Sequence, residues 1–170
     1  MTGSEFRAAR LSPGDAGSVI RLFVRIAVDP AATRFHPHPF GTEDAIRVCN
    51  HAGLDVYAGA FLDETMVGYG MLRGWDEGFA VPALGIYLAP QARGSGIGRR
   101  FMDALHRMAL ERGAQRVMLK VYPDNKAAVA LYRRIGYVFH GETKGQLVGH
   151  IDLPHPGAGP ESALTRKEHE

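Results

Sequence analysis

Three alternating glycines between basic side chains form the segment of this 170-residue chain whose residue types are best suited to chemistry. Gly94, Gly96 and Gly98 lie where an apolar stretch gives way to a helical pattern. Because glycine has no Cβ, consecutive N–H groups there can turn toward one ligand. The first-turn amides of the following helix carry a partial positive charge, and Arg93 and Arg99 add full charges. The segment therefore predicts a cradle for a phosphate or pyrophosphate.

Two common phosphate-binding motifs do not fit this segment. A P-loop places Gly-Lys-Ser/Thr at the start of the helix, whereas Gly98 is followed by Arg99 and Arg100. The dinucleotide fingerprint needs two residues between its second and third glycines, whereas one residue separates Gly96 from Gly98. A glycine-rich turn without a ligand is the remaining alternative. The 21 glycines of the chain, about 12% against an average of roughly 7%, fit either a flexible linker or deliberate backbone geometry.

A second group of residues follows about 30 positions later. Asn125 and Tyr132 are seven residues apart in a helical pattern, which places them on one face, two turns apart. The small Ala128 between them leaves room for the arm of a ligand. Two alternatives without a ligand stay open, in which Asn125 is a helix N-cap and Tyr132 is a core tyrosine.

Together these segments resemble the GNAT superfamily of acyl-CoA-dependent N-acetyltransferases. The cofactor motif of that family, Gln/Arg-x-x-Gly-x-Gly/Ala, is matched by Gln91, Gly94 and Gly96. Its later motif, Asn-…-Ala-x-x-Leu-Tyr-x-x-x-Gly-Phe, is similar to the run from Asn125 to Tyr137. The order of elements over residues 6–152 also follows the order of the family.

The resemblance implies acetyl-CoA as co-substrate and assigns roles to individual residues. The amides of residues 93–98 would hold the coenzyme A pyrophosphate, and the backbone of Tyr87 and Leu88 would pair with the pantetheine arm. Asn125 would contact the cofactor, and Tyr132 would protonate the leaving thiolate as general acid. The cofactor-binding residues that it implies are Tyr87, Leu88, Arg93, Gly94, Ser95, Gly96, Ile97, Gly98, Arg99 and Asn125.

The base that would take a proton from the attacking amine is not evident from the sequence. Many family members carry a carboxylate on the strand before the glycine turn, but residues 79–90 contain none. The candidates for the acceptor site and for its base are mainly loop residues. Alternatively, the attacking amine loses its proton to water without a base from the protein. The candidate bases are His36, His38, Asp76 and Glu77, with Tyr87 as a further alternative, and Trp75 would line the acceptor site beside them. Two histidines without a fixed third ligand do not indicate a metal site, so no metal is predicted.

Hydrophobic periodicity predicts the elements that position these residues. Strand, glycine turn, helix and strand in succession favour an α/β (α+β) domain with at least one parallel pair. The resemblance implies a mixed, mostly antiparallel sheet, splayed in the middle by one parallel strand pair and flanked by about four helices. We expect one N-acetyltransferase domain over residues 1–153 and a flexible C-terminal arm over 154–170. The predicted strands are 6–11, 54–62, 66–73, 83–88, 116–122, 137–141 and 146–152, and the predicted helices are 12–26, 42–51, 97–112 and 125–135.

Composition excludes several classes of protein. The formal net charge of +2 is too small to indicate a nucleic-acid-binding protein. Cys49 is the single cysteine, which excludes an internal disulfide framework, and we expect it in the core. No apolar run approaches the roughly 18 residues needed to cross a bilayer, and the first residues do not resemble a signal peptide. We therefore expect a cytoplasmic protein with no membrane partner. A homodimer, common in the family, stays open.

The leading hypothesis is an enzyme that transfers an acetyl group from acetyl-CoA to a primary amine of a small molecule or peptide. The amine would attack directly in a ternary complex. One alternative is a non-catalytic acyl-CoA-binding or regulatory module, which the missing carboxylate favours. The other is an O-acyl or longer-acyl transferase on the same fold.

Overall fold

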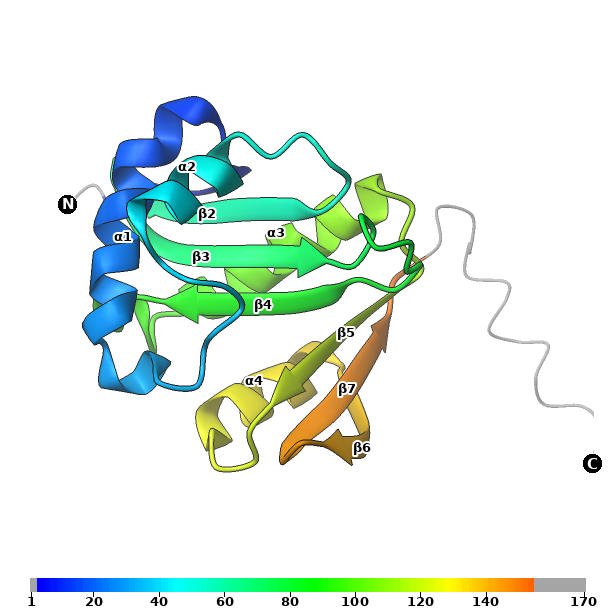
Figure 1. Cartoon of the computed structure of the whole chain (residues 1–170). Coiled ribbons are helices and arrows are strands. Elements are labelled where there is room, and N and C mark those ends of the chain that lie inside the picture. The colour runs from blue at the N-terminus through cyan, green and yellow to red at the C-terminus, as the bar shows by residue number, and fades with distance from the viewer. Residues whose placement is uncertain (1–2, 155–170) are drawn as a thin grey trace, which may run out of the picture.

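The chain folds around one seven-stranded sheet, which a computed structural model describes over residues 3–154 (Figure 1). The strand order is β1-β2-β3-β4-β5-β7-β6, and all neighbours are antiparallel except β4 and β5. This confirms the predicted fold class; the predicted arm lies outside the described residues from 155 onward. The strands are β1 Phe6–Arg10, β2 Val56–Leu62, β3 Thr65–Arg73, β4 Ala83–Leu88, β5 Arg116–Val121, β6 Val138–Thr143 and β7 Gln146–Asp152. The helices are α1 Ala16–Val28, α2 Thr42–Cys49, α3 Ile97–Glu111 and α4 Lys126–Ile135.

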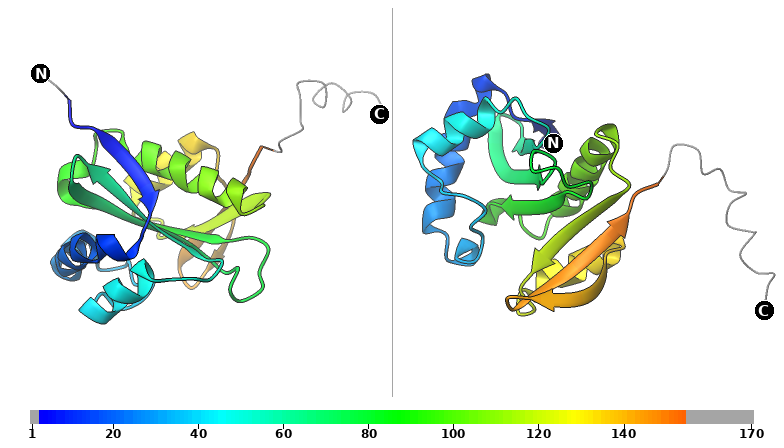
Figure 2. Two further views of the ribbon diagram at one scale, coloured as in Figure 1. Left: turned by 90° about the horizontal axis from the view of Figure 1, so that it is seen from above. Right: turned by 45° about the vertical axis from the view of Figure 1, so that its right-hand side comes forward.

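The helices cover the sheet from both faces. Figure 2 shows α1 and α2 on one face, called here the α1 face, and α3 on the other, called the α3 face. The apolar residues Val19, Leu22 and Phe23 of α1 are buried, as their helical spacing predicts. Phe101 and Leu105 of α3 are fully buried on the opposite side. Within residues 3–154, no helix combines the length and the apolar character that a membrane crossing requires.

The parallel pair β4–β5 holds together at one end only. Ala83 pairs with Met118, and the Met118 N–H donates to the carbonyl of Pro82 at 3.0 Å. Beyond this point the two strands diverge (Figure 1). The Ala89 N–H donates to Val67 of β3. Since alternate residues of an antiparallel strand bond to the same neighbour, the peptide groups of Ile86 and Leu88 face the gap.

Two glycines of β3 allow α3 to lie close to the sheet. A Cβ atom at Gly70 would approach Phe101 to 2.8 Å and Leu105 to 2.9 Å, and one at Gly68 would approach the side chain of Leu88 to 3.0 Å. Real Cβ atoms do not make contacts this short at Gly70, so a larger residue there would force α3 away from the sheet. The separation between β3 and α3 therefore depends on Gly70.

We expect Gly70→Ala to lower the free energy of unfolding by about 1–3 kcal/mol, because overpacking a filled core displaces its side chains. Urea denaturation followed by circular dichroism measures this loss. Gly141→Ala is the matched control, since nothing lies within 4 Å of a Cβ at that strand position. Equal unfolding midpoints for the two variants would contradict the close packing of α3.

Candidate active site

The divergence of β4 and β5 opens a cleft with a volume of about 860 Å³. Its walls come from β4, the glycine turn, β5, α4 and the loop after α1. The two sequence motifs, about 30 residues apart, therefore meet at one cleft. The predicted site residues that line it are Tyr87, Leu88, Arg93, Gly94, Gly96, Gly98, Arg99, Asn125 and Tyr132.

The glycine turn presents the N-terminus of α3 to this cleft. Gly94 and Gly96 have φ angles of +71° and +81°, which favour glycine, and Gly96 is the N-cap residue of α3. Ser95 and Ile97 are not among the lining residues: the Ser95 hydroxyl donates to the Ala92 carbonyl at 2.8 Å, and Ile97 is buried. The unpaired amides at the start of α3 and the positive end of its dipole thus lie at the cleft.

Asn125 and Tyr132 both extend from α4. The Asn125 side-chain oxygen accepts from the Ala128 N–H at 3.3 Å, so Asn125 caps α4 while it lines the cleft. Tyr132 is 9% exposed, and no hydrogen bond of its hydroxyl is found within residues 3–154. Burial raises the pKa of Tyr132 to about 12, so its phenol is protonated at neutral pH. The cleft therefore contains a neutral phenol with a free donor.

Asp29, at the end of α1, bonds to two residues that line the cleft. It was not identified from the sequence. Its carboxylate accepts from the Tyr87 hydroxyl and from the Arg93 guanidinium, each at 2.7 Å. The hydrogen bond from Tyr87 is the main cause that holds the pKa of Asp29 below its usual range. Arg93 also donates to the Leu88 carbonyl at 3.0 Å. Since 58 and 64 residues separate Asp29 from these partners, no local pattern indicates the contact.

A second contact missed by sequence reasoning joins the two sides of the cleft. Arg34, in the loop after α1, forms an ion pair with Asp124, in the turn between β5 and α4. The Arg34 guanidinium also lies 4.7 Å from the centre of the Tyr122 ring. All three residues line the cleft. The two halves of the domain are thus connected across the gap that separates β4 from β5.

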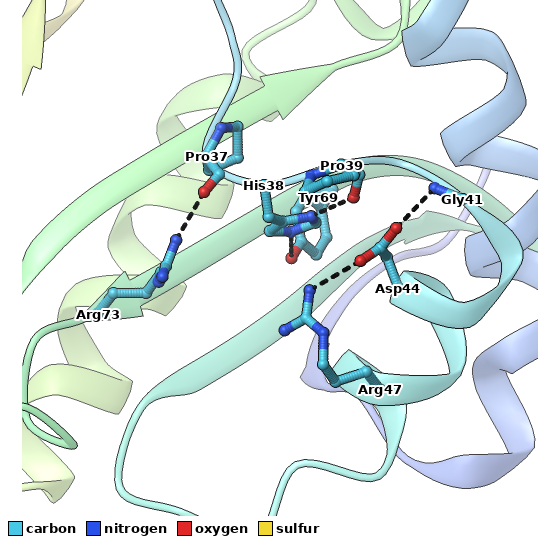
Figure 3. A network of polar contacts seen from close by, with 8 residues as sticks. All are labelled: Pro37, His38, Pro39, Gly41, Asp44, Arg47, Tyr69 and Arg73. Atoms are coloured by element: carbon cyan, nitrogen blue, oxygen red, sulfur yellow. Dashed lines mark hydrogen bonds and ion pairs between the residues drawn. The ribbon is translucent and has the colours of Figure 1, made fainter.

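The five residues predicted for the acceptor site lie away from the lining of this cleft. His38 packs beside β3 (Figure 3), where its Nδ1 lies 2.6 Å from the Pro39 carbonyl and its Nε2 lies 2.7 Å from the Tyr69 hydroxyl. A carbonyl only accepts, so Nδ1 carries the proton and Nε2 accepts from Tyr69. Burial lowers the pKa of His38, which keeps the ring neutral. His36 is exposed in the same loop and contacts the Thr33 carbonyl.

Asp76 holds two loops together. Its carboxylate accepts from the backbone N–H groups of Leu54 and Asp55, at 2.7 and 3.3 Å, and from the His51 ring at 2.8 Å. The bond from the Leu54 amide is the main cause that keeps the pKa of Asp76 below its usual range. Trp75 packs against the core beside it, and Glu77 is exposed. A role of these residues toward an acceptor stays a prediction.

The described part of the chain gathers no group of three or more potential metal ligands from His, Cys, Asp and Glu. Cys49 is buried, as expected from its place in the apolar pattern of α2. Burial raises the pKa of its thiol to about 11. A thiol that is buried and protonated does not behave as a nucleophile at neutral pH.

Comparison with known proteins gives the same family as the two motifs. The sequence model of the acetyltransferase (GNAT) family matches residues 21–137. An uncharacterized protein of Mycobacterium leprae is 33% identical over 114 residues, which are 66% of this chain and 29% of that protein. The chain thus spans less than a third of this relative. Thialysine N-epsilon-acetyltransferase of Mus musculus is 30% identical over 159 residues, covering 86% of this chain and 91% of the mouse protein.

A solved structure supports the fold independently of sequence. The structure of a Salmonella typhimurium protein with its cofactor acetyl-CoA superposes with a TM-score of 0.72 at 16% identity. The superposition covers 92% of this chain and 98% of that protein. The family model covers more than half of the chain, and the motifs that it implies meet at one cleft. The chain therefore belongs to the acetyltransferase (GNAT) family, whose enzymes transfer an acetyl group from acetyl-CoA to an amine.

Proposed function

We propose that acetyl-CoA binds in the cleft between β4 and β5 and that a primary amine of a small molecule or peptide attacks its thioester directly, in a ternary complex. The observation that carries this proposal is the convergence of the glycine turn, the free edge of β4 and the Asn125–Tyr132 face of α4 on one cleft. A non-catalytic CoA-binding module would have no need of a free, protonated phenol there.

Backbone groups hold and polarise the acetyl donor. The amides of residues 93–98, together with the side chain of Arg99, bind the pyrophosphate. The peptide groups of Ile86 and the N–H of Leu88, left without a partner on β5, pair with the pantetheine arm as an added strand would, while the Leu88 carbonyl accepts from Arg93. The Leu88 N–H then donates toward the thioester carbonyl, whose oxygen becomes more negative as the amine attacks. Asp29 supports this arrangement because it fixes both Tyr87 and Arg93.

Tyr132 completes the proton balance of the transfer. The amine nitrogen forms a bond to the acetyl carbon, and the bond from that carbon to sulfur breaks. The Tyr132 hydroxyl donates to the departing sulfur, and the phenol regains its proton from solvent. The products are the acetylated amine and the free thiol of coenzyme A. Because the pKa of Tyr132 is raised to about 12, the donor keeps its proton over the whole neutral range.

The amine loses its proton to water in this proposal. The one carboxylate among the described residues that line the cleft is Asp124, which is paired with Arg34, and no histidine lines it. A paired carboxylate is a weak base, so proton removal depends on the pKa of the acceptor itself. We also propose a cytoplasmic location, supported by the unpaired thiol of Cys49, as is usual in reducing compartments.

Gly96→Ala should weaken acetyl-CoA binding by tenfold or more, because a side chain strains the positive φ angle and rotates the amides of the cradle. Isothermal titration calorimetry with acetyl-CoA measures the change. Gly113→Ala is the matched control: its φ of +83° imposes similar strain at the far end of α3, away from the cleft. Equal loss of affinity in both variants would assign the effect to stability rather than to the cradle.

Tyr132→Phe should lower kcat by about 10²- to 10⁴-fold, the range for loss of a positioned acid, and leave acetyl-CoA affinity within twofold. A thiol reagent follows the release of coenzyme A. Tyr137→Phe is the control. The ring centres of Tyr137 and Tyr132 lie 5.9 Å apart, but the Tyr137 hydroxyl is hydrogen-bonded to His106, outside the cleft. If Tyr132→Phe turns over at the wild-type rate, the general-acid role is wrong.

The pH dependence of kcat/KM should follow the acceptor amine rather than a group of the protein. Below the pKa of the amine, kcat/KM should rise about tenfold per pH unit, because only the neutral amine attacks. It should then level off without a falling limb below pH 10, since Tyr132 stays protonated. Two acceptors of different basicity should level off at different pH values. A common inflection for both, removed by Asp124→Asn, would identify Asp124 as a base.

A further inference from the structure

The acceptor must approach the thioester from the α1 face of the cleft. Leu88 points to the α3 face, where its side chain lies 3.1 Å from the position of a Cβ on Gly98 of α3. Tyr87 points to the opposite face, where its hydroxyl reaches Asp29 of α1. Residues from both faces line the cleft, with Arg34 and Phe35 on the α1 face and Gly98 of α3 on the α3 face. The pyrophosphate cradle belongs to the α3 face, which leaves the α1 face for the amine.

Lys120 of β5 lines the cleft on its α1 face. Along β5, Val117, Leu119 and Val121 are buried, whereas Lys120 is exposed, so Lys120 points away from the buried side. Tyr122, two residues on, lies on the same side as Lys120 by strand alternation. The Tyr122 ring is covered by Arg34, from the loop after α1. Lys120 therefore faces the α1 side of the cleft, which it also lines.

Two of the other cations that line the cleft already have partners. Arg34 is paired with Asp124, and Arg93 is paired with Asp29. Arg99 and Arg134 form no ion pair within the described residues, but they come from α3 and α4, on the side of the cleft away from α1. Leu131 of α4 lies 3.4 Å from the Cβ position of Gly98 of α3, so the two helices pack together there. Lys120 forms no ion pair with any residue of the described chain. Lys120 is thus an unpaired cation on the α1 side of the cleft, and the described lining residues offer it no free carboxylate.

We propose that Lys120 binds a carboxylate of the acceptor, so that the substrate is an amino acid or a similar small amine with a carboxylate. This inference rests on the proposed function of the cleft. A polyamine would bring further positive charge toward Lys120 and find no free carboxylate among the described lining residues. An acceptor with a carboxylate forms a charge-assisted hydrogen bond with the ammonium group and directs its amine toward the free edge of β4.

A panel of amino acids and their carboxamides tests this assignment, with acetyl-CoA turnover measured by thiol release. Each carboxamide keeps the amine of its partner but lacks the negative charge. We expect kcat/KM to be roughly 10- to 100-fold higher for the preferred amino acid than for its carboxamide, the range for one hydrogen bond to a charged group. Lys120→Gln should remove this preference by raising KM for the amino acid.

Lys144→Gln is the matched control, because Lys144 lies in the turn between β6 and β7 and does not line the cleft. It should leave the preference intact. Turnover of carboxamides as good as that of amino acids would overturn the inference, and so would a rise in KM for acetyl-CoA in Lys120→Gln. If no amine is acetylated at all, the proposed function itself fails, and calorimetry with acetyl-CoA separates that outcome from an unfolded protein.

Discussion

The short parallel pairing between β4 and β5 is the constraint on which the site depends. Backbone N–H and C=O groups need partners when they leave water, and a sheet normally supplies them along its whole length. Here the pairing stops after Ala83 and Met118. The gap exposes the peptide group of Ile86 and the N–H of Leu88 in the middle of the sheet rather than at its rim. A ligand that enters with an extended, amide-bearing arm satisfies those groups as a strand would.

Such a gap persists because packing elsewhere prevents it from closing. On the α3 face, Gly70 lets α3 lie directly on β3, so the first helical turn falls beside the end of β4. On the α1 face, Asp29 holds Tyr87 and Arg93 in place. The Arg34–Asp124 pair crosses the mouth, but both side chains are more than half exposed, and such a pair contributes at most about 1 kcal/mol. It therefore orients the loop after α1 more than it stabilises the fold.

The sequence predicted the parts of this site that local patterns encode. The alternating glycines at a strand–helix junction, and the seven-residue helical spacing between Asn125 and Tyr132, predicted residues that line one cleft. Two of these glycines, Gly94 and Gly96, have the positive φ angles that favour glycine. The order of strands and helices was also predicted correctly, because each element carries its own periodicity. Asp29 and the Arg34–Asp124 pair were not, since their partners lie 58 to 90 residues away and no spacing indicates them.

Asp76 shows why composition alone misleads about loops. A carboxylate in the loop before β4 could act as a base, or it could accept hydrogen bonds from the loop backbone. Only the N–H groups around it show which of the two applies. Two backbone N–H groups and His51 bond to Asp76, which favours its charged form and lowers its basicity. The same reasoning separates Lys120 from Arg34 and Arg93, whose guanidinium groups have carboxylate partners. A charged group with its hydrogen bonds satisfied within the fold supports structure, whereas a charged group left unpaired at a cleft is available for a ligand.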